Sequence, residues 1–210
     1  MTRIILVDDH ALVRRGIRLT LEDSAEFEVV GEASDYGELR TLLPKCEYDV
    51  IVLDINLPGK NGIDILKSLR EEAPKCKVLI LSMFTEEQYA VRSLRAGAFG
   101  YLNKASAPEM LIEAIQKIAS GKKFITPEIA EAMANSLTAD IDNHPHEKLS
   151  DREFQTLRLI ASGKRLSEVA EALAISPKTV SVYRARLLEK MGLANNAELT
   201  HYALKNGLVD

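Results

Sequence analysis

The stretch DVIVLDINLPGKNG, Asp49 to Gly62, decides the fold, because a short β-rich run within it stops directly at an acidic side chain. Three further runs of this kind also end next to polar residues. RIILV precedes Asp8 and Asp9, KVLIL precedes Ser82, and FGYL comes just before Lys104. Ligands of an open parallel sheet bind outside the carboxyl ends of its strands. The pattern therefore predicts a pocket in which carboxylates, a hydroxyl and an ammonium meet.

Strand patterns alternate with helix-period segments as far as Gly121, which favours βα units and a parallel sheet. Helices are expected from about His10, Asp35, Asn61, Thr85 and Ala107, each starting near a capping Asp, Asn, Thr or Ser. Five such units predict an α/β fold of the flavodoxin-like, doubly wound type with a five-stranded parallel sheet. Thr126 to Leu137, with Pro127 in its first turn, predicts one further helix that connects two domains.

The composition is that of an ordinary globular protein of one or two domains, with 210 residues, 46% of them apolar and 28% charged. There is neither a signal-peptide pattern nor an apolar run approaching the roughly 18 residues of a membrane span. We therefore expect a cytoplasmic protein that has no membrane partner. Cys46 and Cys76 lack metal-ligand spacing and are too few for a disulfide scaffold, so we interpret both as ordinary thiols.

The end of the chain follows a different pattern from its beginning. Thr138 to Lys148 is polar and aperiodic, which indicates a linker. His144 and His146 in it could bind a metal in principle, but without a nearby Cys we favour a solvated linker. The predicted division is a first domain over residues 1–121, a linker helix and polar linker over 122–148, and a helical domain over 149–210.

The helical domain is expected to contain four helices. Ser150 and Glu153 form a capping box for the first, and Ser167 and Ser176 are expected to cap the next two. The second and third helices are separated only by a short turn, which is a helix-turn-helix signature. Residues 150–210 carry 9 basic and 7 acidic side chains, whereas residues 1–120 carry 15 and 19. This small positive excess would favour a polyanionic partner, although alone it is weak support.

The first half resembles the receiver domain of bacterial two-component response regulators, on the motifs DVIVLDINLPGKNG and GYLNK and the Asp8–Asp9 pair. The resemblance implies that Asp54 accepts a phosphoryl group from a sensor histidine kinase. It also implies a Mg²⁺ ion bound by Asp9, Asp54, the backbone carbonyl of Asn56 and, through water, Asp8.

The same resemblance assigns functions to residues on the neighbouring strands. Lys104 would stabilise the phosphoryl group, while Ser82 and Tyr101 match the pair that converts phosphorylation into a change of packing. Phe84 is expected to shield the acyl phosphate from water.

Elementary chemistry supports these residue types independently. Carboxylates a few Å apart repel each other by roughly 4 kcal/mol per close pair at an effective dielectric constant of about 20, and a dication relieves this repulsion. Mg²⁺ prefers hard oxygen ligands and keeps waters that phosphate oxygens can replace, and Lys104 is expected on the opposite side of the pocket. Taken singly, the aspartates could be helix caps or turn residues and the lysine a solvated side chain. Their joint placement at strand ends favours the functional interpretation.

Leu149 to Asp210 resembles the LuxR-type helix-turn-helix domain of the NarL/FixJ class, on the motifs LSDRE, LRLIASG, VAEAL, ISPKTVSV and LLEKMG. Its turn GKRLSE and its Tyr183 depart from the common pattern, so the preferred DNA sequence could differ. The resemblance implies double-stranded DNA as a partner. Leu199, Tyr202 and Ala203 make a small apolar patch at helical spacing that could also belong in part to the core. In this family the last helix pairs with its mate, which implies a homodimer of the phosphorylated protein with these three residues at its interface.

The helix over Pro177 to Met191 is expected to read DNA. A helical projection turns Val180, Leu187 and Met191 to the core, while Val182 and Ser181 point outward, where they suit contacts with base edges. Charged and polar residues on both flanks suit phosphate contacts. The predicted DNA-binding residues are Lys178, Thr179, Ser181, Val182, Arg184, Ala185, Arg186 and Lys190.

We therefore expect a DNA-binding transcription regulator in which phosphorylation of Asp54 controls dimerisation and DNA binding. An aspartyl-phosphate phosphatase is the enzymatic alternative, since such enzymes also combine an Asp nucleophile, Mg²⁺ and Lys. That class has a second Asp two residues after the nucleophile, where this chain has Asn56. We therefore expect a phosphoacceptor protein with no enzymatic activity other than slow autodephosphorylation. A third possibility, control of DNA without phosphorylation, is disfavoured by the intact acidic set.

Overall fold

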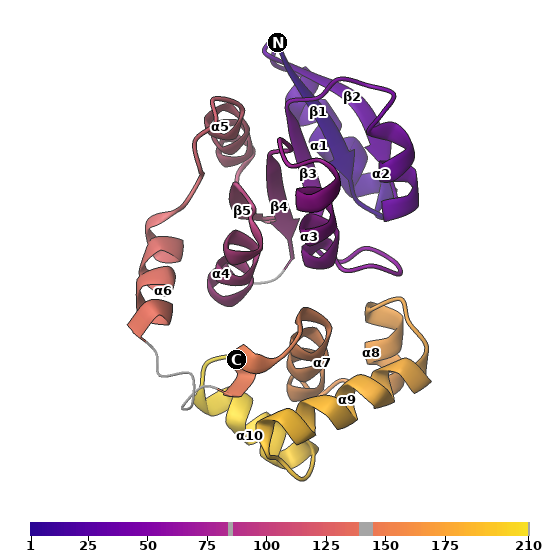
Figure 1. The fold of residues 1–210 in the computed structure, drawn as a ribbon, viewed down its shortest axis with the longest axis vertical. Helices are drawn as coiled ribbons and strands as arrows, with labels where there is room; N and C mark the ends of the chain where they lie inside the picture. Colours follow the sequence, from indigo (N-terminus) through magenta and orange to yellow (C-terminus); the bar gives the residue numbers. More distant parts are fainter. Residues whose placement is uncertain (84–85, 139–144, 210) are drawn as a thin grey trace. The chain divides into compact units, whose positions relative to one another are not determined.

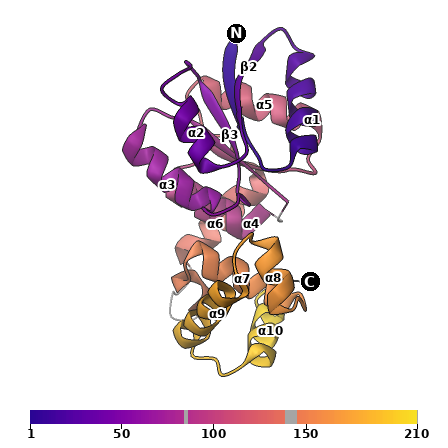
Figure 2. The same cartoon turned by 90° about the vertical axis from the view of Figure 1, so that its right-hand side faces the viewer.

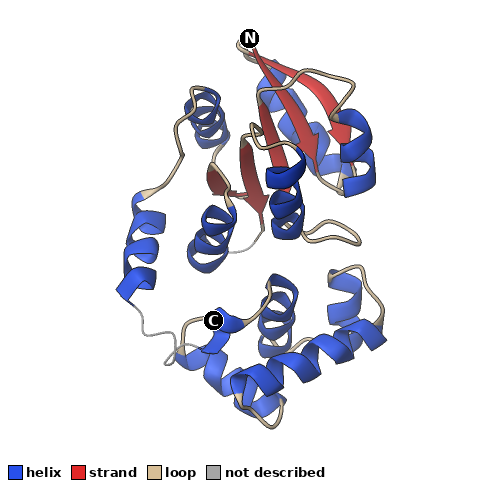
Figure 3. Cartoon of the chain, viewed as in Figure 1, coloured by secondary structure: helices blue, strands red, loops and turns tan. Residues whose placement is uncertain are grey.

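The computed structural model describes residues 1–83, 86–138 and 145–209, in two compact units, Met1–Leu137 and Thr138–Asp210 (Figure 1). All the strands of the described residues lie in the first unit, and the second is built from helices (Figure 3). The predicted linker helix belongs to the first unit. No helix in the described ranges combines the length and the apolar character that a membrane crossing requires.

The first unit contains a five-stranded parallel sheet in the order β2-β1-β3-β4-β5. The strands are β1 Thr2–Val7, β2 Phe27–Ala33, β3 Val50–Asp54, β4 Val78–Ser82 and β5 Gly100–Asn103. This order confirms the predicted flavodoxin-like fold, although the sequence pattern had located only four of the strands and not β2. Because β1 lies between β2 and β3, the direction of winding reverses there, and ligand sites form at such a switch point.

Six helices accompany the sheet in the described part of this unit: α1 Ala11–Glu22, α2 Tyr36–Leu42, α3 Gly62–Glu72, α4 Glu86–Ala96, α5 Pro108–Ala119 and α6 Pro127–Thr138. Side chains of Asp35 and Asn61 cap α2 and α3 as predicted. His10 and Ala107 take the N-cap positions of α1 and α5 without a side-chain cap bond. The expected start of a helix at Thr85 lies outside the described residues.

The core lies on both faces of the sheet, with α1 and α5 on one face and α2 and α3 on the other (Figure 2). Alternate strand residues such as Ile4 and Leu6 pack with Leu21 of α1 and Ile115 of α5 in one buried cluster. Ile5, which lies on the opposite face of the sheet, is also fully buried. Burial on both faces explains why the strands read as continuous apolar runs.

The second unit contains the 3-10 helix η1 Pro145–Lys148 and the helices α7 Asp151–Ala161, α8 Leu166–Ala172, α9 Pro177–Met191 and α10 Asn196–Lys205. The capping box of Ser150 and Glu153 is confirmed. The expected cap at Ser167 is wrong, because α8 begins at Leu166 with Arg165 as its N-cap. The physical reason is that Glu168 accepts a hydrogen bond from the Arg165 amide at 2.6 Å, which sets the start of the helix earlier.

The turn between α8 and α9 is tight. Ala174 adopts a left-handed backbone conformation with φ of 51°, and the Ile175 amide donates to the Ala170 carbonyl at 3.0 Å. Ser176 then caps α9 by accepting from the Thr179 amide at 3.1 Å. The predicted helix-turn-helix connection is therefore present.

Candidate functional site

The acidic residues expected at the strand ends meet at the switch point of the sheet. Asp8 follows β1, and Asp54 is the last residue of the neighbouring strand β3. Both are buried, with exposures of 3% and 2%. The ligand atoms of Asp8, Asp9, His10 and Asp54 all lie within 4.8 Å of one another. The four side chains therefore form one polar cluster.

Lys104 reaches this cluster from the end of β5 and bridges two of its carboxylates. Its Nζ lies 2.6 Å from Oδ2 of Asp8 and 2.7 Å from Oδ2 of Asp54. The lysine thus lies between the two aspartates, and its placement across the pocket from a metal ion stays a prediction. Its backbone amide donates to the Ser82 carbonyl at 2.8 Å, so the adjacent strand end holds it in place.

Burial and charge act against each other in this pair. Burial raises the pKa of the Asp54 carboxyl above its ordinary value, because the attraction of Lys104 offsets only part of the desolvation. Burial alone would lower the pKa of Lys104, but attraction to Asp54 and hydrogen bonds with Asp54 and Asp8 outweigh it and leave that pKa raised. The ammonium therefore stays charged at neutral pH and compensates the acidic cluster.

The backbone after Asp54 is packed so closely that one position requires glycine. A Cβ added to Gly62 would lie 2.4 Å from the Asp54 carbonyl oxygen and 2.7 Å from the Ile55 Cα. The Asn56 amide donates to Oδ1 of Asp54 at 3.1 Å, which fixes the carboxylate from the other side. The sequence pattern does not predict this role of Gly62. No local sequence signal reveals this requirement, because it arises only where the chain returns beside Asp54.

The donor set suits a hard divalent cation. Asp8, Asp9 and Asp54 offer carboxylate oxygens, the ligands that Mg²⁺ prefers. His10 is an unexpected neighbour, whose Nδ1 lies 2.8 Å from Oδ1 of Asp9 and 3.3 Å from Oδ1 of Asp8. The chemistry of these residues is therefore compatible with the metal that the sequence predicts.

Ser82 and Tyr101, the expected switch pair, both lie inside the unit. Ser82 ends β4 and Tyr101 lies on the adjacent strand β5, where it pairs in register with Ile80. Neither side chain has exposed surface. Phe84, expected to shield the phosphoryl group, lies outside the described residues, as does His144.

In the second unit, α9 presents the predicted faces. Val180, Leu187 and Met191 are buried, whereas Val182 is 42% exposed. Lys178, Ser181, Ala185 and Arg186 are exposed as well. An outward valine among polar and basic residues is suited to contact with a base edge in the major groove.

Two of the expected phosphate contacts are bound inside the unit instead. Nε of Arg184 donates to Oδ1 of Asn196 at 2.6 Å, and Nζ of Lys190 lies 2.7 Å from Oε2 of Glu153. These bonds attach α9 to α10 and α7. We therefore revise the expectation for Arg184 and Lys190. Within the described part of the chain, the side chains of Lys178 and Arg186 make no hydrogen bond or ion pair and stay available for phosphates.

The dimer contacts expected on α10 need correction. Leu199 and Ala203 are completely buried, and α10 packs against α7, so these side chains offer no surface to a second copy. The Tyr202 hydroxyl lies 2.6 Å from Nδ1 of His146. His146 is only 5% exposed, which also corrects the expectation that it lies in a solvated linker. The exposed large apolar residue of α10 is Leu204.

Comparisons with known proteins match both units. Residues 4–116 match the response regulator receiver domain, and residues 147–203 match bacterial regulatory proteins of the luxR family. The response regulator UvrY of Escherichia coli is 37% identical over 209 residues, covering 99% of this chain and 96% of that protein. GacA of Pseudomonas aeruginosa, also a response regulator, is 33% identical over 211 residues, covering 100% of this chain and 99% of its own length.

Solved structures are similar over nearly the whole chain. RcsB from Salmonella enterica serovar Typhimurium, bound to the promoter rprA in the presence of the phosphomimetic BeF3−, is 27% identical with a TM-score of 0.65. This match covers 96% of this chain and 97% of that one.

Proposed function

Since this chain belongs to the response regulators that join a receiver domain to a LuxR-type DNA-binding domain, we propose that phosphorylation of Asp54 controls its binding to double-stranded DNA. The phosphoryl donor is a sensor histidine kinase, and the protein acts in the cytoplasm, where its DNA partner lies. The domains that carry these activities span residues 1–121 and 149–210, and of the residues between them α6 lies in the first compact unit and η1 in the second.

One observation carries the proposal. Asp54 lies at the switch point of the sheet with one carboxylate oxygen bound by Lys104 at 2.7 Å and the other by the Asn56 amide at 3.1 Å. This carboxylate is thereby oriented as a nucleophile. It attacks phosphorus in line, the bond from phosphorus to the donor nitrogen breaks, and an acyl phosphate forms on Asp54.

The surrounding residues support this transfer by charge and by position. Mg²⁺, held by Asp8, Asp9, Asp54 and the Asn56 carbonyl, would neutralise charge on the phosphoryl oxygens. The Lys104 ammonium is already within reach of Asp54 and can pair with a phosphoryl oxygen after transfer. Water then removes the phosphoryl group slowly, which limits the duration of the response.

The buried pair Ser82 and Tyr101 is proposed to transmit the change. The Ser82 hydroxyl, at the end of β4, would hydrogen-bond the new phosphoryl group, and the Tyr101 ring would repack in response. The result is a changed association of two copies, which brings two DNA-binding domains onto neighbouring half-sites.

The proposal is tested by mapping the phosphoryl group. We expect the wild type, incubated with a small phosphodonor and Mg²⁺, to be labelled on Asp54, and Asp54→Asn to take no label. Asp64→Asn, on the adjacent helix α3, is the matched control and should label like the wild type. Equal labelling of Asp54→Asn would reject Asp54 as the acceptor.

A second measurement addresses the DNA. Phosphorylated wild type should bind an operator more tightly than the unphosphorylated protein, and Asp54→Asn should show no such response to the phosphodonor. If phosphorylation on Asp54 is found but DNA affinity is unchanged, the acceptor is correct and the proposed control of DNA binding is wrong.

A further inference from the structure

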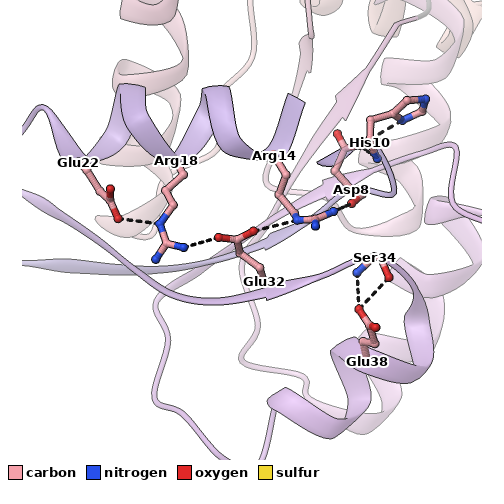
Figure 4. Close-up of polar contacts among 8 residues, drawn as sticks. All are labelled: Asp8, His10, Arg14, Arg18, Glu22, Glu32, Ser34 and Glu38. Atoms are coloured by element: carbon pink, nitrogen blue, oxygen red, sulfur yellow. Dashed lines mark hydrogen bonds and ion pairs between the residues drawn. The ribbon is translucent and has the colours of Figure 1, made fainter. Parts of the chain in front are cut away.

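A network of charged side chains connects α1 and β2 to Asp8 (Figure 4). Asp8 is the first residue of the polar cluster formed by Asp8, Asp9, His10 and Asp54, which is called the acidic pocket below. Nε of Arg14 donates to Oε2 of Glu32 at 2.9 Å, and Nη1 of the same arginine donates to the backbone carbonyl of Asp8. Arg18, one turn further along α1, donates to Oε1 of Glu32 and to Oε1 of Glu22. Only Arg14 of these two arginines contacts the pocket.

The carbonyl that Arg14 contacts belongs to the peptide unit between Asp8 and Asp9. This unit is planar, so a bond that orients its carbonyl also orients the amide of Asp9 and the direction in which Asp9 leaves the chain. The Asp8 amide donates to the Ala33 carbonyl of β2 at 3.1 Å. Asp8 is therefore held at its amide by β2 and at its carbonyl by Arg14.

The side chain of Asp8 is constrained as well. Its Oδ1 accepts from the His10 amide at 2.8 Å, and its Oδ2 pairs with Lys104 at 2.6 Å. The Arg14 bond to the Asp8 carbonyl in turn restrains rotation of the Asp8–Asp9 peptide. Asp9, whose side chain is 31% exposed, would change its direction most if that peptide turned.

Glu32 holds Arg14 in the required orientation. Its two oxygens are divided between Arg14 and Arg18, so the carboxylate is fixed from both sides. A guanidinium is a rigid planar fork, and fixing its Nε–H on Glu32 also directs its Nη1–H toward Asp8. Arg14 is 18% exposed and Glu32 27%, so solvent competes little with this arrangement.

We propose that Arg14, oriented by Glu32, is a positioning residue that sets the Asp8–Asp9 peptide and thereby the affinity of the acidic pocket for Mg²⁺. This rests on the proposed function only in taking Mg²⁺ as the ion of the pocket. Residues outside the direct ligands that orient them typically change metal affinity by about 10- to 100-fold when removed.

The test measures Mg²⁺ binding by titration calorimetry with MgCl₂ on the full chain. Arg14→Gln removes both bonds and should raise the Mg²⁺ dissociation constant by about tenfold. Arg18→Gln is the matched control, because it loses two ion pairs to glutamates in the same network without touching Asp8. Its Mg²⁺ dissociation constant should rise much less than that of Arg14→Gln, because Arg14 keeps its bonds to Glu32 and to the Asp8 carbonyl, even if its thermal stability falls as much.

Arg14→Lys is a second variant in case Arg14→Gln fails to fold. It keeps the positive charge, but an ammonium cannot hold two acceptors in the fixed geometry of a guanidinium. Its dissociation constant should lie between those of the wild type and Arg14→Gln. An unchanged constant in both Arg14 variants, or an equal rise in Arg18→Gln, overturns the proposal.

The phosphorylation rate provides a second readout. With acetyl phosphate as the donor, the rate of Arg14→Gln should fall at low Mg²⁺ and return to within about twofold of the wild type at saturating Mg²⁺. An equal loss at all Mg²⁺ concentrations overturns the proposal, because Arg14 would then act on Asp54 itself. Calorimetry requires no phosphoryl transfer, so it remains decisive about Arg14 even if Asp54 is not the acceptor.

Discussion

The ammonium of Lys104 lies 2.7 Å from Oδ2 of Asp54, although the two residues are separated by 50 positions in the sequence. The pair joins the end of β5 to the end of β3, across β4. Since the same ammonium also pairs with Asp8, it is the counter-ion of two buried carboxylates. The proposed Mg²⁺ site would therefore couple metal binding to stability at this point.

Lys104→Met should destabilise the receiver unit in the absence of Mg²⁺. Removing one member of a buried ion pair leaves uncompensated charge, and we expect a loss of about 3 kcal/mol in the free energy of unfolding. Saturating Mg²⁺ should recover more stability in the variant than in the wild type, because the cation replaces the missing charge. Urea unfolding with and without Mg²⁺ measures both effects.

Lys67→Met is the control for this variant. Lys67 lies 3.8 Å from Asp64 in an exposed pair, and such pairs contribute less than about 1 kcal/mol. Equal effects of the two substitutions would show that Lys104 does not compensate the acidic pocket.

Gly62→Ala should perturb the pocket from its backbone side. The added methyl group would lie 2.4 Å from the Asp54 carbonyl oxygen, and relief requires the backbone of Asp54 to move. We expect a loss of about 1 to 3 kcal/mol in the free energy of unfolding, with weaker phosphorylation. Gly16→Ala, in α1, meets nothing within 4 Å and should stabilise the protein by about 0.5 to 1 kcal/mol. Opposite signs in thermal unfolding confirm the close packing at Gly62, whereas stabilisation by both variants contradicts it.

Stability of the DNA-binding unit should depend on pH through Glu153. Burial alone would raise the pKa of Glu153, but hydrogen bonds from Lys190 and Ser150 outweigh it and hold that pKa below its ordinary value. The stabilisation is therefore complete above the ordinary carboxyl pKa of about 4.3, and is lost as the pH falls through the lower folded value.

Glu153→Gln tests this dependence. The variant should be less stable at pH 7 by about 1 kcal/mol, because it loses a charge-assisted cap and an ion pair that is partly exposed. The difference from the wild type should shrink below pH 4. Denaturation of the full chain between pH 3.5 and 7 measures it, with the exposed Glu189→Gln as the control. A difference that is constant over this range would show that the charge of Glu153 makes no contribution.

Variants of α9 should separate affinity for DNA from specificity. Arg186→Ala should weaken binding to all sequences and lower the salt slope by about one unit, because Arg186 is proposed to contact one phosphate. Val182→Ala should cost roughly 1 to 3 kcal/mol at one base pair and leave the others unchanged.

Lys190→Ala is the informative comparison, because its ammonium pairs with Glu153. It should lower stability without changing the salt slope. Binding to a randomised operator library at several salt concentrations measures all three variants. A salt slope that falls in Lys190→Ala as it does in Arg186→Ala would show that the ion pair opens to bind phosphate.

The sequence by itself determined the features that depend on local chemistry. Apolar runs that end at Asp8, Asp54, Ser82 and Lys104 located strand ends, because strands buried on both faces tolerate little else. Caps such as Asp35, Asn61 and Ser150 were readable because a cap bonds an amide two or three residues away. The outward direction of Val182 followed from helical periodicity.

Only the tertiary structure decided which partners these residues find. Lys104 is held between Asp8 and Asp54, Lys190 is bound to Glu153, and Leu199 is buried in the core of its own unit. Each of these contacts joins elements that are distant in the sequence, and helical spacing gives the same pattern whether an apolar face meets its own core or a second copy. The steric need for Gly62 likewise exists only where the chain returns beside Asp54, because the sequence does not show which atoms lie next to a glycine in the folded chain.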